Sequence, residues 1–150
     1  AKNLVARDWA GSIIDVGSGA GFPGFPLAIW APQAEVTLIE SQGKKAAFLN
    51  QVIFASGLKH AKVFSGRAEV SETKADLVTM RAVEKFEAVL PVAVALVKPE
   101  GRLALMIGEA QVENAKRLCP ELKWNTPMHV PGGHSRVLLV GTKSGNVEPE

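Results

Sequence analysis

The sequence predicts an α/β fold in which a mostly parallel sheet carries helices on both faces and ends in an antiparallel hairpin. Short runs rich in Val, Ile and Leu alternate with segments of helical periodicity along the chain. A glycine-rich segment follows the first run, and a Pro131-Gly132-Gly133 turn separates the last two. A chain of 150 residues has room for one domain, which we expect over residues 1–142, followed by a flexible tail at 143–150.

The first half of the chain contains two predicted strands, each followed by a helix. The β-branched run at 12–16 predicts a buried strand, and the alternating run at 35–40 predicts a second one. A short helix is expected at 26–31, where Pro32 ends it. A longer helix is expected at 42–56, because apolar residues recur there at three- and four-residue spacing and Gly57 follows.

The middle of the chain repeats this alternation. Strands are expected at 61–65 and 75–80. A helix is expected at 86–97, provided that Pro91 lies in its first turn. The Pro99-Glu100-Gly101 sequence predicts a turn.

The last third of the chain predicts a strand at 102–107 and a helix at 111–118. A weaker strand at 124–130 and a strong one at 136–142 follow, and we expect these two to form the antiparallel hairpin at the sheet edge.

Composition excludes several classes of protein. Hydrophobic residues make up 47% and charged residues 21%, which fits a folded globular domain. The net charge of +2 identifies no partner by itself. Cys119 is the only cysteine, so the chain has neither an internal disulfide nor a thiolate metal cage, and we expect a reducing, cytoplasmic location. The apolar run 88–97 is too short for the ~20 residues of a membrane span.

The glycine-rich segment after the first strand is the first candidate for a ligand site. In doubly wound sheets the ligand lies beyond the carboxyl ends of the strands, where Gly17, Gly19 and Gly21 would let the backbone approach it. The dinucleotide fingerprint requires glycine at the position of Phe22, and a P-loop requires a Gly-Lys-Ser/Thr ending. The segment therefore favours neither a dinucleotide nor a nucleoside triphosphate.

Glu40 ends the second predicted strand and is the second candidate. A carboxylate there can accept hydrogen bonds from both hydroxyls of an unphosphorylated ribose. With the acid before the glycines, this combination resembles the class I methyltransferases, whose cofactor is S-adenosylmethionine and whose product is S-adenosylhomocysteine. Gly17, Gly19, Glu40 and the adjoining Ser41 are the expected cofactor contacts on this reading.

A narrower resemblance rests on four blocks of sequence in order. They are 15–24 (DVGSGAGFPG), 40–45 (ESQGKK) with Phe48-Leu49, 66–69 (GRAE) and 81–83 (RAV). Together they resemble the bacterial GidB family, also called RsmG, over roughly Ile13 to Val140. Those enzymes methylate N7 of one guanine in 16S ribosomal RNA.

The GidB resemblance implies specific site residues and partners. It implies cofactor contacts at Gly17, Phe22, Ala68, Glu69 and Arg81, and 16S rRNA or the small ribosomal subunit as the partner. Two departures concern RNA binding. Only about a dozen residues stand before the first strand, where the family has a helical segment, and Ile107-Gly108 replaces the usual Lys-Gly.

Methylation at guanine N7 needs no general base, since that nitrogen has a free lone pair and no proton to remove. The sequence accordingly shows no Ser/His/Asp order and no metal-ligand spacing, and we expect no metal. Arg81 is the candidate for orienting the substrate, because its fork fits a carboxylate or the acceptor edge of guanine. Cytosine C5 methylation would need a nucleophilic cysteine, and we expect Cys119 to be structural.

Four cations are candidate RNA contacts. Lys44 and Lys45 fall in the first turn of a helix, where they oppose the helix dipole and an anionic partner would explain them. A solvated pair, or contact with Glu40, explains them equally well. Arg67 and Arg136 are the other two candidates for phosphate contacts.

Two other functions remain open from the sequence. One is a class I methyltransferase for a small molecule, and the other is a noncatalytic module that binds S-adenosylmethionine or RNA. We expect a monomer that does not enter the membrane.

Overall fold

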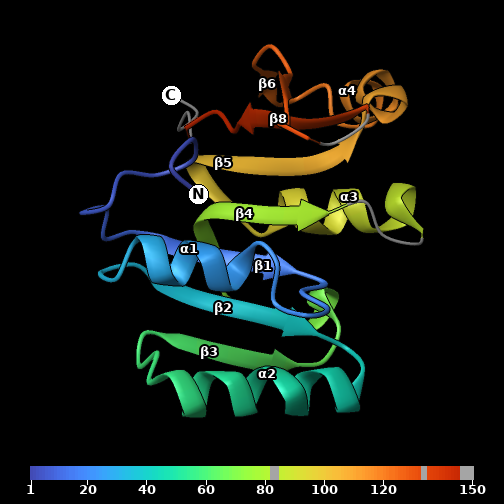
Figure 1. The fold of residues 1–150 in the computed structure, drawn as a ribbon. Coiled ribbons are helices and arrows are strands. Elements are labelled where there is room, and N and C mark those ends of the chain that lie inside the picture. Colours follow the sequence, from blue (N-terminus) through green and yellow to red (C-terminus); the bar gives the residue numbers. More distant parts are fainter. Residues whose placement is uncertain (82–84, 133–134, 146–150) are drawn as a thin grey trace, which may run out of the picture.

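The computed structural model describes residues 1–81, 85–132 and 135–145, and within them the strands form one sheet (Figure 1). Their order across the sheet is β3-β2-β1-β4-β5-β8-β6, with β7 also paired to β8. The strands are β1 (Ser12–Val16), β2 (Glu35–Glu40), β3 (Ala61–Ser65), β4 (Ala75–Arg81), β5 (Val97–Gly108), β6 (Lys123–Trp124), β7 (Met128–His129) and β8 (Arg136–Thr142). The pairs among β1 to β5 are parallel and every pair that includes β8 is antiparallel, which confirms the predicted α/β architecture.

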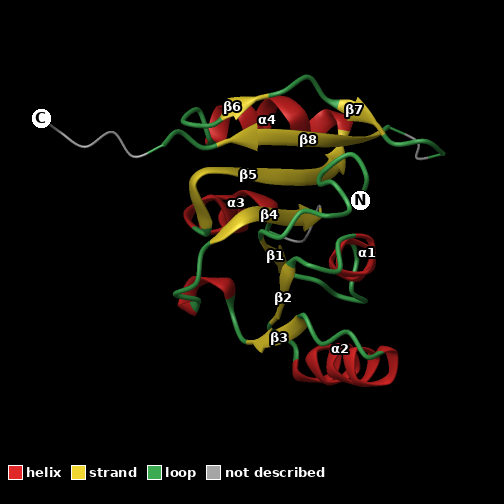
Figure 2. Cartoon of the chain, turned by 90° about the vertical axis from the view of Figure 1, so that its left-hand side faces the viewer, coloured by secondary structure: helices red, strands yellow, loops and turns green. Residues whose placement is uncertain are grey.

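The helices cover both faces of the sheet. They are α1 (Gly24–Trp30), α2 (Gly43–Ser56), α3 (Phe86–Ala95) and α4 (Val112–Leu118), with single 3₁₀ turns η1 (Ala68–Val70) and η2 (Glu109–Gln111). Figure 2 shows α1 and α2 on one side of the sheet and α3 on the other. The last residue of α2 is followed by Gly57 in the left-handed conformation, as its position in the sequence predicts.

The alternation of side chains along the buried strands divides the core into two parts. Ile13 packs with α1, α2 and the N-terminal residues Leu4 and Val5, whereas Ile14 packs with α3 and α4. Both isoleucines are 1% exposed. The first strand can therefore be apolar at successive positions, because each face of the sheet has its own helical layer.

Strand order reverses direction at β1, which pairs with β2 on one side and β4 on the other. The chain runs from β1 through β2 to β3 at one edge, and then returns to β4 and continues to β5 in the opposite direction. The loop after β1 lies at this switch point, where open α/β sheets bind ligands.

Two expectations for the middle of the chain are wrong. Pro91 lies inside α3 and not in its first turn, and its side chain is on the exposed face of the helix. The turn expected at 99–101 is instead a bulge within β5, whose pairing to β4 passes from Val97 to Arg102. A Cβ at Gly101 would lie 2.8 Å from the carbonyl oxygen of Lys98, so the bulge requires glycine there.

The C-terminal hairpin also differs in detail. The strand expected at 124–130 is interrupted, and β6 and β7 pair separately with the same edge of β8. Pro127 lies in the gap and has no N–H to donate to a strand partner. Lys143, which was expected in a flexible tail, is held in place instead: its ammonium donates to the carbonyl oxygens of Val94 and Val97. Residues 146–150 fall outside the described part of the chain.

The N-terminal residues pack on α1 through a polar and an aromatic contact. Trp30 Nε1 donates to the Val5 carbonyl oxygen at 2.9 Å, and the Arg7 guanidinium lies 4.9 Å from the centre of the Trp30 ring. No helix in the described residues is both long enough and apolar enough to cross a membrane.

Candidate functional site

The loop that follows β1 has a backbone that depends on glycine. Gly17, Gly19 and Gly21 have φ values of 65°, 58° and 98°, in the region that side chains disfavour. A Cβ at Gly19 would approach only Arg81 Nη2, at 3.4 Å. The space beside Gly19 therefore opens toward the end of β4, as an approach of ligand to backbone requires.

Asp15 in β1 fixes this loop from beneath. Its Oδ2 accepts hydrogen bonds from Ser18 Oγ at 2.9 Å and from the Gly24 N–H at 3.1 Å. Its Oδ1 accepts one from Thr79 Oγ1 of β4 at 2.8 Å. Asp15 is 1% exposed, so it acts as an internal anchor between the loop, α1 and β4.

Burial dominates the titration of Asp15. Loss of solvent raises the pKa of its carboxyl from 3.8 to about 6, although the hydrogen bonds from Thr79, Ser18 and Gly24 and the positive charge of Arg81 oppose the rise. Burial is therefore the dominant effect on Asp15, and the charge of Arg81 offsets only a small part of it.

Glu40 lies at the carboxyl end of β2 and points toward the loop. Its Oε2 accepts a hydrogen bond from the Gly19 N–H at 2.9 Å, and its Oε1 accepts one from the Gln42 N–H at 3.1 Å. A carboxylate has about four acceptor positions, so about two remain for a ligand. Glu40 thus links the glycine loop to the start of α2 and keeps acceptor capacity for hydroxyl groups.

Arg81 closes the site from the end of β4. Its Nε is buried and has no hydrogen-bond partner among the described residues. A buried donor without a partner is costly and uncommon, so it marks a place where a ligand could supply the hydrogen-bond acceptor. The structure therefore brings Gly19, Glu40 and Arg81 together, as the sequence predicts.

The segment after β3 adjoins this group. The Gly66 N–H donates to the Glu40 carbonyl oxygen at 3.0 Å, which holds the start of the segment beside β2. Ala68 is 8% exposed and packs in the same core cluster as Ile39, whereas Glu69 is exposed. Ser41 follows Glu40 and is exposed.

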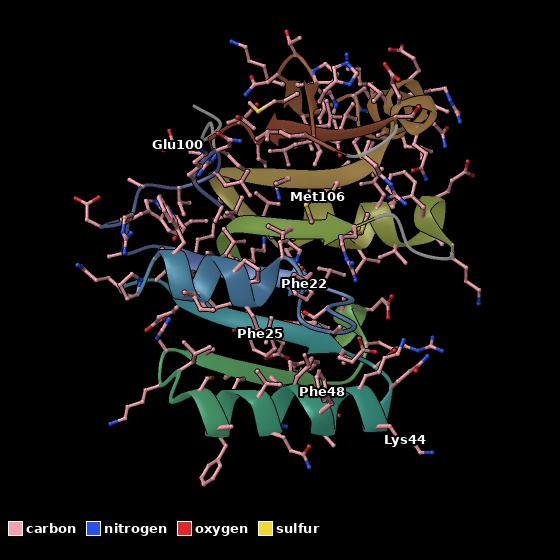
Figure 3. All side chains as sticks on the ribbon, in the orientation of Figure 1. Phe22, Phe25, Lys44, Phe48, Glu100 and Met106 are labelled. Carbon is pink, nitrogen blue, oxygen red and sulfur yellow. The ribbon has the colours of Figure 1, made fainter. Side chains whose placement is uncertain are left out.

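Phe22 projects from the glycine loop and is 52% exposed (Figure 3). Its side chain is therefore not part of the hydrophobic core. Its predicted contact with a cofactor stays a prediction.

The four candidate RNA-binding cations are all exposed. Lys44 and Lys45 lie in the first turn of α2, and Arg67 follows β3. Arg136 begins β8 opposite Gly108, at the carboxyl end of β5. All four lie on the side of the sheet where the parallel strands end, which also carries Glu40 and Arg81. The distance from β3 to β8 along this side is about 24 Å.

The partners of Asp15 are a feature of the site that the sequence alone did not reveal. Thr79 is the direct neighbour of Asp15 in the parallel pairing of β1 with β4. The sequence does contain an indication of this contact. Each of the two strands carries a polar residue between apolar ones, and buried polar groups require a hydrogen-bond partner. Cys119 is buried, in agreement with a structural role, and loss of solvent raises the pKa of its thiol to about 11.

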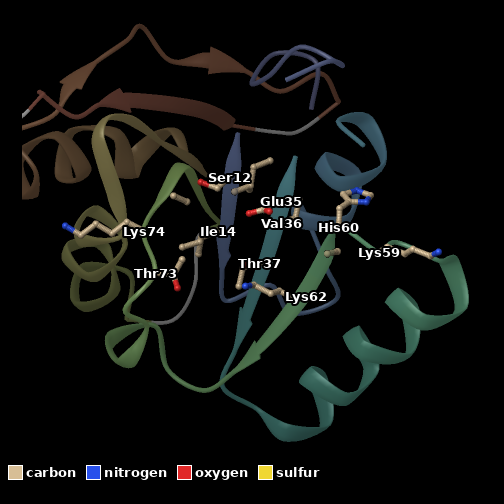
Figure 4. A pocket seen from close by; sticks show the side chains of 13 residues that line it. Ser12, Ile14, Glu35, Val36, Thr37, Lys59, His60, Lys62, Thr73 and Lys74 are labelled. Carbon is tan, nitrogen blue, oxygen red and sulfur yellow. The ribbon is translucent and has the colours of Figure 1, made fainter. Parts of the chain in front are cut away.

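Two cavities in the described part of the chain lie away from the glycine loop. One, of about 220 Å³, is at the amino ends of β1 to β3, and Ser12, Glu35 and His60 are among its lining residues (Figure 4). The other, of about 380 Å³, lies between η1 and α3, with Ala68 and Glu69 at one side. Neither cavity is lined by Gly19, Glu40 or Arg81.

A parallel sheet with this strand order, a glycine loop at the switch point and an acid ending β2 define the fold of the class I S-adenosylmethionine-dependent methyltransferases. A predicted O-methyltransferase from Agrobacterium tumefaciens superposes with a TM-score of 0.76 at 26% identity, covering 93% of this chain and 77% of that one.

Within that class, this chain belongs to the GidB family: the family model described as rRNA small subunit methyltransferase G matches residues 2–134. The ribosomal RNA small subunit methyltransferase G of Roseiflexus castenholzii is 37% identical, covering 91% of this chain and 64% of that protein. The enzyme of the same name from Stenotrophomonas maltophilia is 38% identical, covering 81% of this chain and 59% of that protein. The chain thus spans about three-fifths of the length of these relatives.

Proposed function

We propose that this chain transfers a methyl group from S-adenosylmethionine to N7 of a guanine in 16S ribosomal RNA. The observation that carries the proposal is the convergence of Gly19, Glu40 and Arg81 at the switch point of a class I methyltransferase fold. Family membership supports the choice of ribosomal RNA as the substrate.

The residues present fit the cofactor. Arg81 offers a buried donor that has no partner within residues 1–81, 85–132 and 135–145, and this donor suits the carboxylate of an amino acid. Glu40 offers free acceptor positions for ribose hydroxyls, and Gly19 leaves room for the ligand between them. The proposed cofactor-binding residues are Gly17, Gly19, Phe22, Glu40, Ser41, Ala68, Glu69 and Arg81.

The proposed reaction requires positioning rather than proton transfer. S-adenosylmethionine, when bound, supplies a methyl group on a positively charged sulfur. The protein has to exclude water and hold guanine N7 in line, and Arg81 is close enough to the glycine loop to contribute to that orientation. In the described part of the chain, no cluster of three His, Cys, Asp or Glu side chains could hold a metal ion, and the proposed reaction uses none.

Arg81 has two possible partners in this proposal, the cofactor carboxylate and the guanine edge. If it orients guanine, Arg81→Ala lowers turnover far more than cofactor affinity. If it binds the cofactor, affinity and turnover fall together. Calorimetry with S-adenosylhomocysteine and single-turnover methylation on the same variant separate the two roles.

The proposed RNA contacts are Lys44, Lys45, Arg67 and Arg136. Each exposes a positive charge on the sheet edge that holds the cofactor residues, as phosphate contacts beside a methylated base require. We propose that the protein acts as a cytoplasmic monomer on 16S rRNA or on the small ribosomal subunit.

The deciding experiment is methyl incorporation from labelled S-adenosylmethionine, followed by mapping of the modified base. Protein-free 16S rRNA and assembled small subunits from a strain lacking the modification serve as parallel substrates. Label at guanine N7 is the expected result, unchanged by a metal chelator. Label on small molecules alone, or cofactor binding without any transfer, contradicts the proposal in favour of the small-molecule enzyme or the noncatalytic module.

A further inference from the structure

The second turn of α2 exposes an aromatic side chain beside the two lysines. Phe48 is 48% exposed. It follows Lys44 by four positions and Lys45 by three, so the three side chains share one face of the helix. Figure 3 places Lys44 and Phe48 toward the end of the molecule where β2 and β3 end. We call these three residues the α2 surface.

The α2 surface carries positive charge without a compensating acid. The 14 residues of α2 include no Asp or Glu, and among the described residues neither lysine forms an ion pair. Glu40, the nearest acid before the helix, directs its carboxylate at the Gly19 and Gln42 amides. The charges of Lys44 and Lys45 are therefore available to a negatively charged partner.

The α2 surface follows the strand that carries Glu40. α2 begins three positions after Glu40 and packs against β3 and β2. β2 is separated from β4, which ends at Arg81, only by β1, so β2 and β4 lie about 10 Å apart and the α2 surface lies beyond β2. An unpaired RNA segment of several nucleotides that presents a base near Arg81 can therefore extend past β2 to the α2 surface.

We propose that the α2 surface binds unpaired RNA next to the methylated guanine, with Phe48 stacked on one base and Lys44 and Lys45 on the flanking phosphates. Proteins that bind single strands combine aromatic side chains with cations in this way, because every base has a face that stacks. Unpaired segments are also the part of RNA whose bases proteins can reach. This inference rests on the proposed function, since it assumes an RNA substrate.

Phe54 provides a matched control on the same helix. It is 91% exposed, more than Phe48, but the last turn of α2 has no basic residue. If exposed phenylalanine alone increased RNA affinity, Phe54→Ala and Phe48→Ala would have similar effects. The proposal requires that only Phe48 matter.

The first test is the affinity of the 150-residue protein for a fluorescent single-stranded oligonucleotide and for protein-free 16S rRNA at several salt concentrations. Phe48→Ala should weaken binding by about 5- to 150-fold with an unchanged salt slope, Phe48→Trp should restore it, and Phe54→Ala should match the parent. Lys44→Ala with Lys45→Ala should reduce the slope by ~0.7 per lost contact. Circular dichroism establishes that each variant is folded.

The proposal is overturned if Phe48→Ala binds RNA like Phe54→Ala, or if the parent binds neither probe. It is also overturned if Phe48→Ala weakens binding only to assembled small subunits, because Phe48 would then contact protein. The proposed function fails separately, if the parent binds RNA through Phe48 but leaves guanine N7 unmethylated. Conversely, if Phe48→Ala methylates guanine N7 with the KM of the parent, the proposed function stands and the α2 surface has no role in RNA binding.

Discussion

The parallel strands all begin on one side of the sheet and all end on the opposite side, and we call these sides the amino edge and the carboxyl edge. The polar groups at the two edges are satisfied in different ways. At the amino edge, the Ser12 N–H and hydroxyl both donate to Asp76 Oδ2, at 2.9 and 3.0 Å, and the Asp76 N–H donates back to Ser12 Oγ. At the carboxyl edge, three glycines adopt left-handed conformations, and Arg81 Nε is buried without a partner in the part of the chain that the structure describes. At the amino edge, Ser12 and Asp76 satisfy each other's hydrogen bonds. At the carboxyl edge, a donor of Arg81 and acceptor positions of Glu40 remain for a ligand.

This difference locates function better than cavity volume does. The cavity of about 220 Å³ lies at the amino edge, where the hydroxyl of Ser12 is already bonded to Asp76. The carboxyl edge holds glycines whose backbone a ligand can approach closely, and a buried Arg81 donor that has no partner among the described residues and is unfavourable unless a ligand supplies an acceptor. Substitutions at the two edges should therefore separate binding from stability.

The largest expected effect is at the carboxyl edge, from Gly19→Val. A β-branched residue at φ 58° is strained, and its side chain fills the space between the loop and Arg81. We expect a folded domain, destabilised by about 1–2 kcal/mol, that shows no measurable binding of S-adenosylhomocysteine by calorimetry. Normal binding would mean that the loop is only a turn.

Asp15→Asn should remove a pH dependence that belongs to the carboxyl edge. Because burial raises the pKa of Asp15 from 3.8 to about 6, the folded state binds the proton more tightly than the unfolded chain does between these values. Its contribution to the free energy of unfolding is complete only below the unfolded value of 3.8 and is lost as the pH rises through about 6. The parent should lose about 2 kcal/mol relative to the variant between pH 4 and 7.

Urea unfolding of parent and variant at several pH values measures this difference. Taking the difference cancels the other titrating groups, such as Asp76, that the substitution leaves alone. A difference that stays constant over pH 4 to 7 would show that Asp15 titrates at an ordinary pKa in the folded protein.

The two ends of β2 allow a direct comparison of the edges. Glu40→Ala should weaken S-adenosylhomocysteine binding by about 1–3 kcal/mol, because charge-assisted hydrogen bonds to the ribose are lost and the Gly19 N–H loses its acceptor. Glu35 begins the same strand and is exposed, so Glu35→Ala should leave the affinity unchanged. Equal affinities for the two variants would remove Glu40 from the site.

The sequence predicts the fold where one physical signal dominates. Apolar runs in β1, β2 and β8 identify buried strands because each face of the sheet has its own core. The bulge in β5 is not predictable from Pro99 and Gly101, because a turn and a bulge use the same residues and only pairing with β4 distinguishes them. Pro91 escapes prediction in a similar way, since the packing of α3 on the sheet overrides its low helix propensity.

The candidate site follows the same rule. Gly19, Glu40 and Arg81 are predictable because strand ends in a parallel sheet meet at one edge. The bond between Asp15 and Thr79 depends on the register of β1 against β4, and neither strand encodes that register alone. The unpaired Nε of Arg81 depends on the positions of all neighbouring side chains, so only the structure shows it.

The smallest expected effect is at the amino edge, from Ser12→Ala. The variant loses the hydroxyl that donates to the Asp76 carboxylate and accepts from the Asp76 N–H. The free energy of unfolding should therefore fall by about 1–2 kcal/mol. Cofactor affinity should not change, because this edge holds no group of the proposed site.

The pKa of Asp76 is lowered chiefly by the Ser12 backbone N–H, with smaller contributions from the Ser12 hydroxyl and Lys98, and burial opposes the shift. A lowered carboxyl pKa stabilises the fold above the unfolded value and loses that contribution as the pH falls. The variant keeps the backbone N–H, so most of this acid-side loss should persist in its urea unfolding curves. A fall in cofactor affinity as large as that of Glu40→Ala would show that the two edges are coupled and that the separation argued from their hydrogen bonds is wrong.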